Sequence, residues 1–242
     1  MVTFPFPLLP PPPPNRALTQ SYISSWMMPP IEVLTRYGLL PLYFGHIQII
    51  GLENLPRNGS LILAPTHRSR WDSLIVPYAA GRHRTGRHIR FMVSQDEVRG
   101  IQGWFIQRLG GFPIDPKQPT IASLRHGVNL LHNGEILVIF PEGNIYRQSL
   151  VKPLRQGLAR LAIQSEMTKP GLGLQIVPIG LTYSDPVPRW RSRVRVNIGQ
   201  PLNVADYVHT SNPYALKESA KQLTAHLHSV LQSLVPSTSI VP

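Results

Sequence analysis

Residues 61–80 read LILAPTHRSRWDSLIVPYAA, and this stretch sets the pattern that the rest of the chain repeats. Its first four residues are apolar and indicate a short buried strand, which Pro65 ends. A polar loop follows, and the second apolar part of the stretch predicts a helix over residues 71–80. We therefore expect a strand, a loop with polar side chains and a helix, in that order.

The loop holds one histidine and one aspartate, His67 and Asp72, five positions apart. On one regular helix, five steps turn through about 140°, and the two side chains would point to different faces. A bend between strand and helix brings them together, with His67 on the turn and Asp72 in the first helical turn. The carboxylate then accepts the Nδ1 hydrogen of the imidazole and leaves Nε2 free as a base. Taken alone, the pair also fits a surface histidine beside an aspartate at a helix start.

Beyond residue 45, predicted strands alternate with predicted helices. The strands cover residues 46–50, 61–64, 89–94, 112–115, 136–140, 175–181 and 194–198. The helices cover residues 71–80, 96–109, 120–132, 154–167 and 213–234. The alternation predicts an α/β fold, with a mixed, largely parallel sheet flanked by helices.

The N-terminal part differs from the rest in composition. Residues 1–16 include five consecutive prolines and are predicted to form a proline-rich disordered arm. Residues 17–44 predict a pair of apolar helices, broken at Pro29 and Pro30, which cover the core or lie at a membrane interface. The charge-free runs at residues 17–31 and 38–52 are too short to predict a transmembrane helix.

The composition limits the possible chemistry. The chain has no cysteine, which excludes disulfides, thiolate zinc sites and cysteine nucleophiles. Its nine histidines form no compact ligand cluster, so we expect no metal and no cofactor. The formal charge of +12 predicts an anionic partner: a membrane surface, an acidic carrier protein, a phosphate-bearing substrate or a nucleic acid. No nucleic-acid motif is present, and the aromatic residues are not interleaved with the basic runs, so we expect no nucleic-acid partner.

Two further polar blocks follow predicted strands. Residues 110–115 read GGFPID and residues 140–144 read FPEGN. Loops at the ends of strands converge on one ligand site in open α/β sheets, so we expect both blocks to lie near His67. Gly143 suits the positive φ of a tight turn. Glu142 taken alone also fits an ordinary turn residue.

Together these blocks resemble the 1-acylglycerol-3-phosphate acyltransferases. His67 and Asp72 match that family's His-x4-Asp motif, and residues 110–115 resemble its Gly-x-x-x-Ile-Asp segment. Residues 140–143 match Phe-Pro-Glu-Gly in full, and residues 177–180 resemble a late Val-Pro-Ile segment. The resemblance covers roughly residues 40–205 and implies an acyltransferase domain over residues 45–235.

The resemblance implies acyl transfer from acyl-CoA or acyl-carrier protein to the hydroxyl of a lysophosphatidic-acid-like lysolipid, in phospholipid biosynthesis. It implies His67 as general base, Asp72 as its partner, and Glu142 and Gly143 as substrate-binding residues. The family carries arginines after its second and third motifs, where this chain has Pro116 and Asn144-Ile145. The remaining candidates for the acceptor's phosphate are Arg68, Arg70, Lys117 and Arg147.

The departures leave other functions open. A lysophospholipid or other lipid-hydroxyl acyltransferase needs no free phosphate on its acceptor. From other classes, a basic nucleic-acid-binding protein and a non-catalytic membrane-surface protein stay as alternatives. For the enzyme, we expect a cytoplasmic protein that lies peripherally on the membrane.

Overall fold

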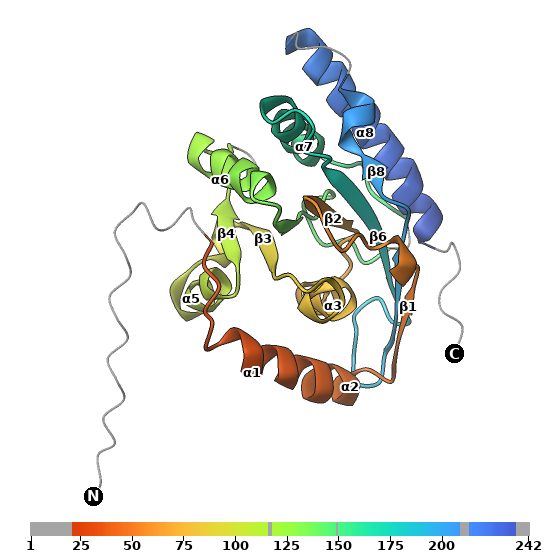
Figure 1. The fold of residues 1–242 in the computed structure, drawn as a ribbon. Helices are drawn as coiled ribbons and strands as arrows, with labels where there is room; N and C mark the ends of the chain where they lie inside the picture. Colours follow the sequence, from red (N-terminus) through yellow and green to blue (C-terminus); the bar gives the residue numbers. More distant parts are fainter. Residues whose placement is uncertain (1–20, 116–117, 149, 209–212, 236–242) are drawn as a thin grey trace, which may run out of the picture.

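The computed structural model describes residues 21–115, 118–148, 150–208 and 213–235. The proline-rich segment and Lys117 lie outside these ranges. The strands are β1 (His46–Ile50), β2 (Leu61–Pro65), β3 (Ile89–Ser94), β4 (Gly111–Ile114), β5 (Ile136–Val138), β6 (Gln175–Tyr183), β7 (Arg193–Ile198) and β8 (Leu202–Asn203). They form one sheet in the order β1-β7-β6-β2-β5-β3-β4, with β8 paired to β6 (Figure 1).

The sheet is mixed and largely parallel, as predicted. The pairs of β6 with β7 and with β8 are antiparallel, and the other described pairs are parallel. β2 is buried along its whole length because helices cover both faces of the sheet there. Ile62 packs toward α6 (Ile121–His132), α7 (Gly157–Thr168) and α8 (Pro213–Leu234). Leu61 and Leu63 pack on the opposite face, with α3 (Asp72–Ala80).

The predicted N-terminal helix pair is wrong in one respect: Pro29 and Pro30 begin a helix and do not break one. α1 (Met28–Val33), a π-helical segment (Leu34–Leu39) and α2 (Leu40–Tyr43) follow one another without interruption. Proline fits the first turn of a helix because its missing N–H needs no partner there. Residues 21–24 are not helical. The N–H groups of Tyr22 and Ser24 donate to the carbonyls of Gln107 and Arg108, at the end of α5 (Gly100–Arg108).

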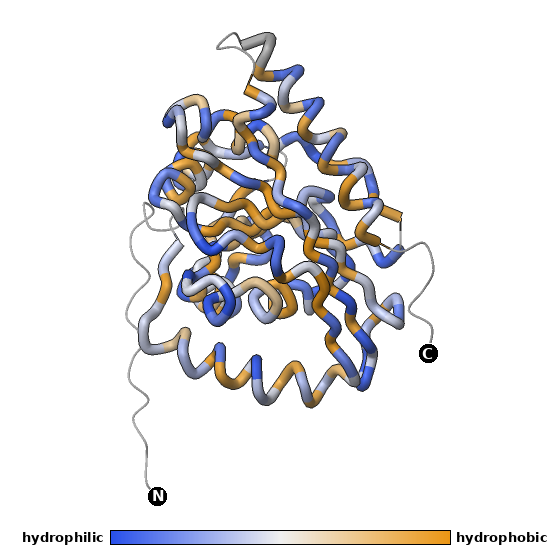
Figure 2. Tube along the Cα trace, turned by 45° about the vertical axis from the view of Figure 1, so that its right-hand side comes forward, coloured by the Kyte–Doolittle hydropathy of each residue, from blue (hydrophilic) through white to orange (hydrophobic). Residues whose placement is uncertain are grey.

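The helical segment from α1 to α2 crosses one side of the sheet below α3, and apolar residues recur along it (Figures 1 and 2). No helix in the described part of the chain is both long enough and apolar enough to cross a membrane.

Two boundaries differ from the sequence prediction in ways that matter for the site. β5 ends at Val138, and Phe140 already belongs to the following turn. The helix predicted from residue 96 begins at Gly100, because Gln95–Glu97 forms a separate 3-10 turn. A short helix, α4 (Arg82–Thr85), connects α3 to β3 and was not predicted.

Candidate active site

The two loops that carry the predicted site leave neighbouring strands at the same edge of the sheet. β2 and β5 are parallel partners, with Leu61 opposite Ile136. The loop after β2 and the turn after β5 therefore emerge side by side. The N–H of Tyr146 donates to the carbonyl of His67 over 2.8 Å and joins the two loops.

His67 and Asp72 are in contact, as predicted. Nδ1 of His67 lies 2.8 Å from Oδ2 of Asp72, whose side chain is fully buried. The same oxygen accepts the backbone N–H groups of Arg68 over 2.6 Å and Ser69 over 2.8 Å. A carboxylate surrounded by N–H donors acts as an acceptor, so the hydrogen of the neutral imidazole lies on Nδ1 and Nε2 carries a free lone pair.

Two features hold this pair in place. Asp72 is the first residue of α3, where the helix dipole favours a negative charge. The His67 ring stacks on Phe140, with 4.0 Å between the ring centroids. The imidazole is therefore fixed both at its edge and on its face, and its side chain is 20% exposed.

Tyr183, at the end of β6, is a partner of Asp72 that sequence reasoning missed. Its hydroxyl donates to Oδ1 of Asp72 over 2.6 Å. Burial, and then the neighbouring Asp72 carboxylate, raise the pKa of Tyr183 well above its usual value. The phenol therefore stays protonated and donates to Asp72. The two residues lie 111 positions apart, and only the pairing of β6 with β2 brings them together.

Glu142 is buried and accepts hydrogen bonds from the loop that carries His67. Its Oε1 accepts the His67 N–H over 3.0 Å and Nη1 of Arg68 over 2.8 Å. Its Oε2 accepts the N–H of Lys152 over 3.0 Å. Arg68 is 5% exposed, and its Nη1 also donates to the carbonyl of Tyr146. Arg68 and Glu142, both predicted to bind substrate, thus contact other groups of the protein and do not line the cavity beside His67.

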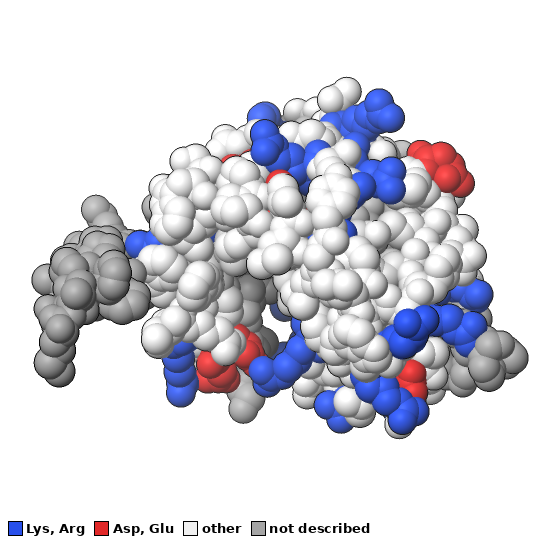
Figure 3. Space-filling view, turned by 90° about the horizontal axis from the view of Figure 1, so that it is seen from below, with Lys and Arg blue, Asp and Glu red and all other residues white. Residues whose placement is uncertain are grey.

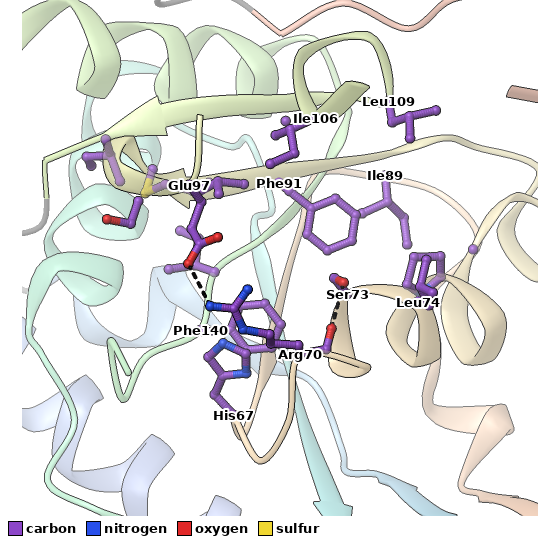
Figure 4. Close-up of a pocket in the computed structure, with 18 of the residues that line it drawn as sticks. His67, Arg70, Ser73, Leu74, Ile89, Phe91, Glu97, Ile106, Leu109 and Phe140 are labelled. Atoms are coloured by element: carbon purple, nitrogen blue, oxygen red, sulfur yellow. Dashed lines mark hydrogen bonds and ion pairs between the residues drawn. The ribbon is translucent and has the colours of Figure 1, made fainter. Parts of the chain in front are cut away.

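That cavity has a volume of about 1060 Å³, at the top of the usual range of about 300–1,000 Å³ for ligand sites. His67, Arg70 and Phe140 lie at one end (Figure 4). Its walls are mainly apolar and include Leu74, Ile89, Phe91, Met92, Ile106, Leu109, Leu158 and Leu161. α1 contributes Met28 and Ile31. The cavity thus offers a long apolar chain a path that starts at the histidine.

The other end of the cavity is basic. Its lining next to the C-terminal end of α3 and the start of β3 includes Arg36, Arg82, His83 and His88, with one acidic side chain, Glu32, 3.6 Å from Nδ1 of His88. Burial, and then the charges of Arg36 and Arg84, lower the pKa of His83 to about 4. His83 is therefore neutral at pH 7, and the positive charge of this end comes from the arginines.

The remaining predicted residues are placed differently from one another. Gly143, with φ 71°, lines the cavity beside His67. Arg70 lines it too, 79% exposed, with Nη2 3.7 Å from Oε1 of Glu97. Arg147 is exposed and does not line the cavity. Within the described residues, no group of three or more His, Asp or Glu side chains is arranged to hold a metal ion.

Fold and site define an α/β enzyme in which a carboxylate-supported histidine lies at the mouth of an apolar cavity. The sequence model described as Acyltransferase matches residues 46–182, more than half of the chain. The chain belongs to this acyltransferase family, and it is an acyltransferase.

Two curated relatives carry the name 1-acyl-sn-glycerol-3-phosphate acyltransferase. The protein of Bacillus subtilis (strain 168) is 27% identical over 203 residues, which cover 78% of this chain and 92% of the relative. The protein of Streptococcus pneumoniae is 28% identical over 169 residues, or 67% of this chain and 58% of the relative. The crystal structure of the acyltransferase PlsC from Thermotoga maritima has a TM-score of 0.60 at 16% identity, and covers 85% of this chain and 77% of PlsC. That similarity shows the same fold.

Proposed function

We propose that this acyltransferase moves a fatty acyl group from a thioester to the free hydroxyl of a lysophosphatidic-acid-like acceptor in phospholipid synthesis. The observation that carries the proposal is the His67–Asp72 pair, with Nε2 unoccupied, at the end of a long apolar cavity. The names of the bacterial relatives support the same acceptor class. The acyl donor is acyl-CoA or acyl-carrier protein, both anionic and thus suited to a basic protein.

In the reaction, Nε2 of His67 takes the proton of the acceptor hydroxyl as its oxygen attacks the thioester carbonyl. The new C–O bond forms, the C–S bond breaks, and the leaving thiolate takes the proton back from the imidazolium. Asp72 stabilises the imidazolium and holds its orientation. The acyl group passes directly to the acceptor. Neither of the two nearby serines is placed as a nucleophile activated by His67, because Ser73 donates to the carbonyl of Arg70 and Ser69 accepts the Trp71 N–H.

The test is acyl transfer with radiolabelled palmitoyl-CoA and palmitoyl-acyl-carrier protein against a panel of acceptors. The panel holds lysophosphatidic acid, glycerol 3-phosphate, lysophosphatidylcholine and monoacylglycerol. We expect labelled phosphatidic acid from lysophosphatidic acid at the highest kcat/KM. A protein that transfers the label to none of these acceptors, with either donor, contradicts the proposal.

A second candidate acceptor class follows from Asn144 and Ile145, which stand where the resembling family has threonine and arginine and which line the cavity here. A lysophospholipid or another lipid alcohol without a free phosphate is this alternative. It predicts that lysophosphatidylcholine or monoacylglycerol is used faster than lysophosphatidic acid in the same panel.

We also infer that the protein binds peripherally to a membrane through the segment from α1 to α2. Leu34 and Leu42 on this segment are 66% and 67% exposed and do not line the cavity. Seen from this side, basic side chains lie beside a hollow in the surface, and acidic side chains lie among them at its rim (Figure 3). Apolar side chains flanked by positive charge suit an anionic bilayer, at roughly 1 kcal/mol per basic residue near the surface.

The variant Leu34→Glu/Leu42→Glu is expected to lose most of its binding to vesicles that contain one-third phosphatidylglycerol, because it places two carboxylates in the bilayer interface. Sedimentation with the vesicles measures the bound fraction. The control is Ile121→Glu, which changes an equally exposed side chain on α6. Equal binding of the two variants would refute the assignment of this surface.

A further inference from the structure

We propose that Arg155 binds the anionic phosphate of the acceptor at the histidine end of the cavity, held in position by the turn at Gly143. The inference rests on the proposed function and names a residue for it that the matched motifs do not contain. Arg155 lies after the Phe-Pro-Glu-Gly turn and shortly before α7. It lines the cavity together with His67, Gly143 and Asn144.

A backbone hydrogen bond fixes the position of the Arg155 main chain. Its N–H donates to the carbonyl of Pro141 over 2.8 Å, so the residue is tied to the turn that carries Glu142. Glu142 in turn accepts the His67 N–H. Two hydrogen bonds and one short turn therefore connect the backbone of Arg155 to the backbone of the catalytic histidine.

The side chain crosses directly over Gly143. A Cβ atom on Gly143 would lie 2.4 Å from Nε of Arg155, 2.7 Å from its Cδ and 3.0 Å from its Cζ. Gly143 is thus needed for two reasons. Its φ of 71° is costly for other residues, and its missing side chain leaves room for the guanidinium. The turn therefore holds the side chain of Arg155 against Gly143, in the wall of the cavity that His67 also lines.

The acceptor's chemistry demands a cation at this place. In lysophosphatidic acid with a free central hydroxyl, the phosphate is on the neighbouring carbon, so both groups lie close to Nε2 of His67 during attack. The phosphates of coenzyme A are separated from the thioester by the long pantetheine arm and lie farther away. A guanidinium suits this role because it donates two parallel hydrogen bonds to phosphate.

The neighbouring arginines are less suited. Arg68 is buried in its ion pair with Glu142. Arg70 lies on the α3 side, beside Glu97; it is exposed, as Arg155 is, so the two arginines differ in position and not in exposure. Arg36 and Arg82 line the other end of the cavity. Of the described residues, Arg155 is the cation that combines a place beside His67 with packing against a turn of the site.

The experiment compares Arg155→Ala with the parent protein on two acceptors, lysophosphatidic acid and monoacylglycerol, with the same acyl donor. We expect the KM for lysophosphatidic acid to rise at least about tenfold, with KM for the donor and the rate on monoacylglycerol unchanged. Arg155→Lys restores part of the loss. The control is Arg160→Ala, which removes an exposed arginine of α7 that does not line the cavity. An equal effect on both acceptors, or a selective loss in Arg147→Ala and none in Arg155→Ala, overturns the proposal.

A binding measurement separates this inference from the proposed reaction. Lysophosphatidic acid, below its micellar concentration, is titrated into a His67→Ala protein and into His67→Ala/Arg155→Ala. Weaker binding by the double variant supports the anion site even if the acyl transfer reaction differs from the one proposed. Equal binding by both proteins refutes the site.

Gly143→Ala provides a second, independent variant. Its new methyl group displaces the guanidinium, so it is expected to reproduce the selective rise in KM. Because both changes remove one contact, the rise in KM for Gly143→Ala/Arg155→Ala is expected to be no larger than for Arg155→Ala alone, while the strain of alanine at φ 71° lowers the melting temperature of both Gly143→Ala variants. Additive losses would show that the turn and the arginine act separately, contrary to the proposal. Thermal unfolding of each variant confirms that the fold is retained.

Discussion

His67→Ala is expected to lower kcat about 10²- to 10⁴-fold, the usual contribution of a general base, in the acyl transfer assay. A hydroxyl is a poor nucleophile at neutral pH. The ring of His67 lines the apolar cavity and is oriented by the buried Asp72, whereas His83 and His88 line the other end of the cavity. KM for either substrate is expected to change much less, because the histidine is proposed to take the proton of the acceptor hydroxyl in the transition state and not to bind either substrate.

The variant is informative because the fold tolerates it. Without the imidazole, Asp72 keeps the N–H groups of Arg68 and Ser69 and the hydroxyl of Tyr183 as donors. The buried carboxylate therefore stays hydrogen-bonded, and the melting temperature is expected to stay close to that of the parent. His46→Ala, which removes an exposed histidine at the start of β1, is the control. Near-normal turnover by His67→Ala would remove the assigned mechanism.

The meeting of His67 and Asp72, which the sequence predicted, is local, and the place of residues 140–144 beside them followed from the rule that loops at strand ends converge. A strand that ends at Pro65, a turn and a helix start define how His67 and Asp72 meet, and all of this lies within 20 residues. The parts that were missed are long-range. Tyr183 reaches Asp72 through the β2–β6 pairing, and Arg155 reaches Gly143 because the chain returns to the Phe-Pro-Glu-Gly turn. No periodicity in the sequence reports such contacts.

Arg68 illustrates the same limit. Its place beside His67 suggested a phosphate ligand, but the direction of its side chain is determined by Glu142, which lies 74 positions away. Similarly, Pro29 and Pro30 suggested a helix break. The effect of a proline depends on whether it stands inside a helix or in its first turn. Residues 22 and 24 are extended because they pair with the end of α5, so the helix begins only at Met28 and both prolines fall in its first turn.

The second large effect is expected from Glu142. Glu142→Ala leaves Arg68 as a buried guanidinium without its carboxylate, and breaking a buried ion pair in this way costs about 3–5 kcal/mol. Nε and Nη2 of Arg68 already have no hydrogen-bond partner among the described residues, which increases its dependence on Glu142. In a chain of this size, the loss corresponds to a melting temperature lower by about 10 °C. Differential scanning calorimetry measures it.

Glu142→Gln tests the reason for the effect while keeping the shape. The carboxylate accepts at both oxygens, from His67 and Arg68 at Oε1 and from Lys152 at Oε2. A glutamine amide has one acceptor oxygen, so in either orientation its NH₂ faces a donor. We therefore expect Glu142→Gln to be destabilised too, and kcat to fall less than in Glu142→Ala, because an amide oxygen at the Oε1 position still accepts the His67 N–H. Glu53→Gln, at an exposed position, is the matched control.

The double variant Arg68→Met/Glu142→Leu separates charge from position. It removes both buried charges together, so it is expected to recover much of the stability lost in Glu142→Ala. It does not restore an acceptor for the His67 N–H, and kcat therefore stays low. A double variant that regains both stability and turnover would show that Glu142 serves only to neutralise Arg68. Regained stability without turnover would show that the same carboxylate also positions the histidine, which is the outcome that its two-sided hydrogen bonding predicts.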